Sequence, residues 1–88
     1  MTTNTGFEFE IAEGVFDDWE FIELLGELEG GNGLKLPAVL ERLIGAEGAA
    51  ALKEHCRDTR SGKVTVKAMR TELTDIMTAA ANRGKKKN

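Results

Sequence analysis

The chain has 88 residues, of which 41% are hydrophobic, and a formal net charge of −3. A chain of this length buries only about 60% of its unfolded surface, so it can form one small domain but not a doubly wound nucleotide-binding sheet. Its apolar runs are far shorter than the roughly 18 residues of a membrane-spanning helix. Without a signal-peptide pattern, and with Cys56 as its single cysteine, we expect a chain of the reducing cytoplasm.

The net charge hides a strong asymmetry along the chain. Residues 1–33 contain nine acidic residues and no Lys or Arg, whereas residues 34–88 contain six acidic residues and all twelve basic ones. The two segments therefore carry net charges of −9 and +6. This pattern is typical of two solvated faces on one domain, and it also permits acidic and basic surfaces of two copies to attract each other. The residues that we assign to self-association are Asp17, Glu20, Lys67 and Arg70.

The chain ends differ in composition from the segment between them. Residues 1–6 are polar and residues 83–88 are basic, so both are predicted to be disordered and to flank one helical domain over residues 7–82. Apolar and acidic residues alternate from Phe7 to Ile11, which predicts a short strand or one arm of a hairpin. A weaker alternation at Val64 and Val66 offers a pairing partner, although either segment could be irregular.

Four helices are predicted, over about residues 18–28, 36–44, 46–57 and 66–82. Their boundaries rest on residues that favour helix ends. Asp17 or Asp18 is a good N-cap for the first helix, Gly45 separates the second from the third, and Thr65 can cap the last. The fold class is therefore mainly α, a small bundle of about four helices with a short N-terminal strand or hairpin.

The last predicted helix has a continuous apolar face, and its spacing indicates packing against a core rather than a ligand site. The residues of this face are Val66, Met69, Leu73, Ile76, Met77 and Ala80.

The residue types needed for catalysis are missing from any recognisable arrangement. His55 has no nucleophile or acid at a useful spacing, and Cys56 lies next to it on a predicted helix, where neighbours point about 100° apart. We expect His55 on the surface and Cys56 in the core. The glycines of residues 30–33 lack the Lys and Ser or Thr of a phosphate-binding loop. The sequence predicts no enzyme, no catalytic residue, no metal site and no cofactor.

A calcium-binding loop can be aligned on Gly62 but fails on its ligands. With Gly62 at the sixth position, Arg57 is at the first and Ala68 at the twelfth, where calcium needs carboxylates. Nucleic-acid binding is also disfavoured, because the basic segment contains no aromatic residue to stack on a base.

The first predicted helix carries more apolar surface than one core contact requires. Its apolar residues span about 220° of the helical circumference, against the roughly 100° of an ordinary surface helix. Trp and Phe are the residue types that often anchor protein interfaces. We therefore assign partner binding to Trp19, Phe21, Ile22 and Leu25.

The order of features resembles the small tail assembly chaperones of long-tailed bacteriophages. The similarity runs over residues 15–88: an acidic, Trp-containing opening helix with Asp17-Asp18-Trp19, then Leu52-Lys53-Glu54-His55, a loop with Gly62-Lys63-Val64, and a final amphipathic helix. The loop before Gly62 is less acidic than the family pattern.

The resemblance implies a mainly helical protein that binds the long tape measure protein, brings tail tube subunits to it and leaves before the virion matures. It also implies that a frameshifted longer product can exist. Two other interpretations stay open: a small acidic protein–protein adaptor or regulator, and a degenerate helix-loop-helix module without calcium.

Overall fold

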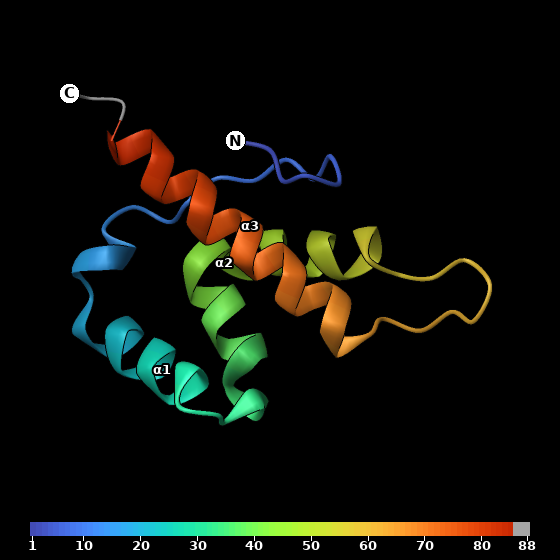
Figure 1. The fold of residues 1–88 in the computed structure, drawn as a ribbon, viewed down its shortest axis with the longest axis horizontal. Helices are drawn as coiled ribbons and strands as arrows, with labels where there is room; N and C mark the ends of the chain where they lie inside the picture. Colours follow the sequence, from blue (N-terminus) through green and yellow to red (C-terminus); the bar gives the residue numbers. More distant parts are fainter. Residues whose placement is uncertain (86–88) are drawn as a thin grey trace. The chain divides into compact units, whose positions relative to one another are not determined.

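The structure, a computed structural model, describes residues 1–85, with side chains described to residue 82. The described part contains three α-helices, α1 (Trp19–Glu29), α2 (Leu36–His55) and α3 (Val66–Lys85), and two short 3-10 helices, η1 (Val15–Asp17) and η2 (Gly33–Lys35) (Figure 1). The predicted mainly helical character is confirmed. The four-helix bundle and the N-terminal strand are not, because this part holds three helices and no strand. Of the tail predicted to be disordered over residues 83–88, residues 83–85 belong to α3 instead, and residues 86–88 lie outside the described residues.

Local capping explains where α1 and α3 begin. The Asp18 carboxylate accepts hydrogen bonds from the backbone N–H groups of Glu20 (2.9 Å) and Phe21 (3.4 Å), which have no partner inside the helix. At α3 the Thr65 hydroxyl accepts from the backbone N–H of Ala68 at 3.1 Å. Both caps agree with the sequence prediction, and α3 runs past the predicted end at Asn82 to Lys85.

Gly45 interrupts α2 without ending it. Its backbone angles, φ 84° and ψ 160°, are not helical, and helical geometry resumes on its far side. The positive φ is available to glycine at little cost, whereas a side chain there would be strained. Helix therefore forms on both sides of Gly45, as predicted, and the two segments of α2 are joined at a kink; the second segment ends at His55 instead of Arg57.

The chain divides into two compact units, and the boundary falls inside α2. One unit is continuous, Glu10–Ala49, and the other combines Met1–Phe9 with Ala50–Asn88. The first contains ten acidic and two basic residues, a net charge of −8, and the second contains five acidic and ten basic residues, a net charge of +5. We call them the acidic unit and the basic unit. The sequence predicted one domain over residues 7–82 and gave no sign of a boundary inside α2.

The acidic unit has an ordinary aliphatic and aromatic core. Leu28 and Phe21 of α1 are buried, as is Val15 of η1. One side of α2 contributes apolar residues to this core, and they recur every three or four positions as on a single helix face. The buried residues of this side are Leu36, Val39, Leu40, Leu43 and Ile44. The backbone N–H of Ala12 donates to the Leu43 carbonyl at 2.8 Å, which fixes the segment that precedes η1.

The basic unit contains an N-terminal turn where a disordered segment followed by a strand is predicted. The backbone N–H of Thr3 donates to the Phe7 carbonyl and that of Phe9 to the Met1 carbonyl, both at 2.9 Å. A single antiparallel bridge joins Thr2 and Glu8. Residues 1–9 therefore pair among themselves, and Val66 is helical, so the predicted partner segment is not used.

The core of the basic unit combines the N-terminal turn with the two helical segments of this unit. Phe7, Phe9 and Thr3 are buried from the turn, Leu52 from α2, and Leu73 and Ile76 from α3. Leu73 and Ile76 confirm the predicted core face of the last helix, while Met69 is partly exposed and Val66 is 63% exposed.

Candidate partner-binding surface

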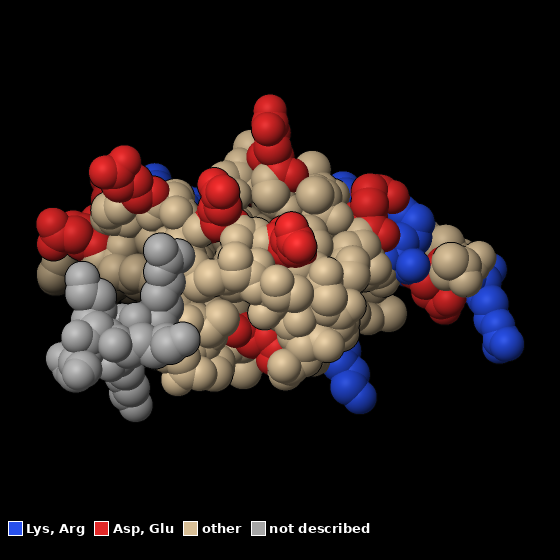
Figure 2. Space-filling model, turned by 90° about the horizontal axis from the view of Figure 1, so that it is seen from above, with Lys and Arg blue, Asp and Glu red and all other residues tan. Residues whose placement is uncertain are grey.

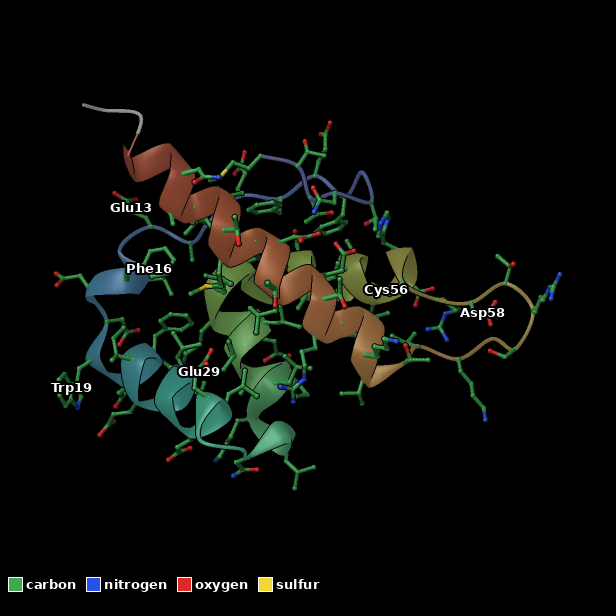
Figure 3. The ribbon with its side chains drawn as sticks, viewed as in Figure 1. Glu13, Phe16, Trp19, Glu29, Cys56 and Asp58 are labelled. Atoms are coloured by element: carbon green, nitrogen blue, oxygen red, sulfur yellow. The ribbon has the colours of Figure 1, made fainter. Side chains whose placement is uncertain are left out.

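The four α1 residues predicted to bind a partner divide into exposed and buried sets. Trp19 is 72% exposed and Ile22 is 42% exposed, whereas Phe21 is fully buried and Leu25 is half-buried. Figure 3 shows the Trp19 side chain pointing away from the ribbon. Phe16 of η1 is also 46% exposed. Phe16 contacts Phe21 rather than Trp19, so we call Trp19 and Ile22 alone the α1 apolar surface.

The buried and exposed sets follow from the geometry of the α1 N-terminus. The rings of Phe16 and Phe21 meet edge to face, with their centroids 5.9 Å apart, so η1 covers the side of α1 that carries Phe21. Trp19 lies two residues before Phe21, about 200° away around the helix, and therefore faces outward. Phe21 thus belongs to the core, and the surface available to a partner is narrower than the predicted apolar arc.

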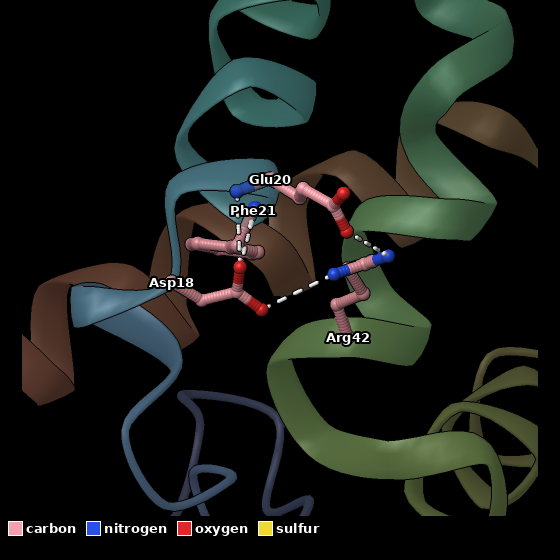
Figure 4. A network of polar contacts seen from close by, with 4 residues as sticks. All are labelled: Asp18, Glu20, Phe21 and Arg42. Atoms are coloured by element: carbon pink, nitrogen blue, oxygen red, sulfur yellow. Dashed lines mark hydrogen bonds and ion pairs between the residues drawn. The ribbon is translucent and has the colours of Figure 1, made fainter.

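Arg42 of α2 holds the first turn of α1 in place within the acidic unit. Its guanidinium donates to the Asp18 carboxylate at 3.1 Å and to the Glu20 carboxylate at 3.3 Å (Figure 4). Asp18 therefore both caps α1 and binds Arg42. All three side chains are well exposed, so we assign to these ion pairs an orienting role and a small contribution to stability.

Several acidic residues of the segment that contains the α1 apolar surface form no ion pair in the described structure. Lys35 pairs with Glu27 at 3.4 Å, and Arg42 pairs with two other carboxylates. Among the described residues, no ion pair involves Glu13, Asp17, Glu23 or Glu29. The surface therefore combines exposed apolar area with a net negative field, which favours a partner that carries basic groups.

The residues predicted for self-association are all exposed, and they separate by unit. Asp17 and Glu20 lie in the acidic unit, and Lys67 and Arg70 lie on α3 in the basic unit. Acidic and basic side chains both reach the molecular surface (Figure 2). Glu20 is already paired with Arg42 of its own chain, so Asp17 is the better candidate for a contact with a second copy.

A second polar cluster joins the N-terminal turn to the rest of the basic unit. The Thr5 hydroxyl donates to Glu72 Oε2 at 2.6 Å and lies 2.9 Å from His55 Nε2. The Thr5 hydroxyl thus links Glu72 of α3 to His55 at the end of α2. Phe7 packs against the His55 ring at 5.3 Å. His55 is exposed as expected, but it has a structural role that the sequence did not indicate.

Glu72 is the most unusual side chain of this cluster. It is only 3% exposed, and its Oε1 is buried without a hydrogen-bond partner among the described residues. One turn further along α3, the Asp75 carboxylate accepts from the backbone and side-chain N–H groups of Asn4 at 3.2 and 3.1 Å. Cys56 is only partly buried, and its burial together with the nearby Glu72 charge raises the pKa of its thiol, which disfavours a reactive thiolate.

The loop between α2 and α3 is held by side chains where a calcium loop would hold an ion. The Arg57 guanidinium donates to both Glu54 oxygens, at 3.0 and 2.7 Å, and to the Gly62 carbonyl at 2.7 Å. The Asp58 carboxylate accepts from the backbone N–H of Arg60 and from the Ser61 hydroxyl. The positively charged Arg57 side chain therefore contacts the Gly62 carbonyl and the Glu54 carboxylate, the kinds of oxygen that a calcium ion would bind.

We predict that Arg57→Gln raises the Glu54 pKa toward its ordinary value of 4.5, because the hydrogen bond from Arg57 is the main cause that lowers it. A lowered folded-state pKa stabilises the fold above the unfolded pKa, and this contribution is lost as the pH falls through the folded value. An NMR titration of the Glu54 side chain checks the shift. Arg60→Gln is the control, and an equal shift in that variant would contradict the assignment.

The structure shows no group of three or more His, Cys, Asp or Glu residues that could hold a metal ion within its described part. Likewise, none of the helices described over residues 1–85 is long and apolar enough to cross a membrane. Comparisons with protein-family models, with curated proteins and with solved structures find no match.

Proposed function

We propose that this chain is a tail assembly chaperone of a long-tailed bacteriophage, which acts in the cytoplasm of the bacterial host. In this role it binds the tape measure protein, and tail tube protein as a second partner, during tail assembly and is absent from the mature virion. The observation that carries the proposal is the 72% exposure of Trp19, a large aromatic residue, with Ile22 also exposed one turn further along α1.

An exposed apolar helix face supports this function on physical grounds. Trp19 and its neighbours would remain in contact with water unless a partner covers them, and an amphipathic helix can bury such a face by packing its own apolar stripe against it. A long helical client has many apolar positions that need cover before they pack. Because the surface is small, its affinity for any one segment should be modest, which suits a chaperone that later dissociates.

Co-expression with the cognate tape measure protein tests the proposal. We expect the soluble fraction of the tape measure protein to rise with this chain and to fall when Trp19 is replaced by Ala. The matched control is Leu34→Ala, because Leu34 is 90% exposed on η2 in the same unit but lies outside the α1 apolar surface. A tape measure protein that stays equally insoluble with and without the chain would refute the function.

Self-association between unlike units is part of the same proposal, since an extended client must be covered by many copies. The opposite net charges of the acidic and basic units favour head-to-tail contacts, which need not close into a ring. We expect the weight-average mass in light scattering to fall as NaCl rises from about 0.05 to 0.5 M, because salt screens exposed charges. The double variant Lys67→Glu/Arg70→Glu should reduce association at low salt, and a mass independent of salt would contradict an electrostatic contact.

A further inference from the structure

The exposed side of α1 contains a position without a side chain. Trp19, Ile22 and Gly26 are spaced by three and four residues, so they follow one another along a single helix face. Gly26 is exposed, and a Cβ atom placed on it would meet no other atom of the chain within 4 Å. Its φ is not positive, so the backbone does not require glycine there. Nothing within the described fold explains a residue that disfavours the helix at this point.

Close approach by another backbone would explain Gly26. The distance between two packed helices depends on the side chains at their point of contact, and it is shortest where a small residue lies between them. Trp19 and Ile22 supply apolar contact area on one side of Gly26. A helix lying along this face could place a bulky side chain over Gly26 while its own apolar residues cover Trp19.

The charges around this face define the chemistry of the approaching helix. Glu23 and Glu29 lie three residues before and after Gly26, one on each side of the face, and neither forms an ion pair among the described residues. No Lys or Arg is present in α1. A helix with Lys or Arg on both flanks of its apolar stripe would therefore find carboxylates on both sides, whereas an acidic helix would be repelled.

We propose that the α1 apolar surface binds an amphipathic helix whose apolar stripe is flanked by Lys and Arg, and that the two helices approach most closely at Gly26. This inference deepens the proposed function, on which it rests for the existence of a helical client, by specifying the charge pattern of the client segment. In a tape measure protein, the bound segments are then the helical stretches with basic flanks.

Two synthetic peptides of about 20 residues, long enough to form helices in water, test the inference. Both carry the same Leu and Ala stripe, and their flanks are Lys in one and Glu in the other. Binding is followed through the fluorescence of Trp19, which is the single tryptophan of the chain. We expect the Lys peptide to shift the Trp19 emission maximum to shorter wavelength and the Glu peptide to leave it nearly unchanged. Binding of the Lys peptide should weaken at high salt, because salt screens the charges.

Gly26→Ala separates binding from folding, because the two effects have opposite signs. The added methyl group meets nothing within this chain and favours the helix, so the melting temperature should rise. The same methyl group would lie between the two backbones, so binding of the Lys peptide should weaken by about tenfold or more. Leu34→Ala should bind as the unchanged chain does.

Each other outcome overturns a stated part of the inference. Equal binding of both peptides would exclude the charge pattern, and unchanged affinity of Gly26→Ala would exclude close approach. A blue shift that depends on protein concentration without peptide would identify a second copy as the occupant. Because no tape measure protein is used, binding of the Lys peptide together with failure of the co-expression test would retain the surface and refute only the phage function.

Discussion

Replacing Phe21 by Ala should lower the free energy of unfolding by about 3–5 kcal/mol, the range for a large aromatic residue removed from a packed core. Phe21 is fully buried and meets Phe16 edge to face, so its loss leaves a cavity and removes an aromatic contact. Trp19→Ala, only two residues away, should change the free energy of unfolding by less than about 0.5 kcal/mol, since Trp19 is 72% exposed. Urea denaturation followed by circular dichroism measures both.

A milder variant keeps this prediction testable if Phe21→Ala does not fold. Phe21→Leu retains most of the apolar volume and should cost less than about 1.5 kcal/mol. Measured with the co-expression assay, Trp19→Ala should lose client binding while it keeps its stability. An equal loss of stability in Trp19→Ala and Phe21→Ala would place Trp19 in the core and remove the basis of the proposed function.

The second large effect is expected at Thr5. Thr5→Val keeps the shape of the side chain but removes the hydroxyl that donates to Glu72, so both oxygens of a carboxyl group that is 3% exposed would lack partners. Leaving a buried polar group unsatisfied costs about 1–3 kcal/mol. The exposed Thr78→Val, on α3, is the matched control and should cost less than about 0.5 kcal/mol.

A double-mutant cycle shows whether this cost belongs to the Thr5–Glu72 contact. In a Glu72→Met background the buried carboxyl group is absent, so adding Thr5→Val should have little further effect on the free energy of unfolding. We expect a coupling energy of about 1–2 kcal/mol from chemical denaturation of the four proteins. Additive effects would mean that Thr5 stabilises the turn by another route.

Sequence patterns predicted the structure well where short-range interactions determine it. The start of α1 at Asp18, the cap at Thr65 and the interruption at Gly45 each depend on residues within one helical turn. The pattern placed helices before and after Gly45 but could not give the kink between them, which depends on the backbone angles at that single glycine.

Contacts between distant residues were not predictable from local patterns. The N-terminal turn is stabilised by a bond from Thr5 to Glu72, 67 residues away, and by bonds from Asn4 to Asp75, 71 residues away. Periodicity identified the α1 helix as unusually apolar, but not which part of it the neighbouring η1 covers. For that reason the predicted binding set included Phe21, which is buried, along with Trp19 and Ile22, which are exposed.

The discontinuous composition of the basic unit sets an order of events during synthesis. The acidic unit is one continuous stretch, so all of its residues have been made once residue 49 has been added. Residues 1–9 are made before α3 but must wait for it, and closing a loop of about 65 residues adds an entropic barrier. The residues around Trp19 are thus all present before α3 is made, whereas the N-terminal turn can close on Glu72 and Asp75 only after it.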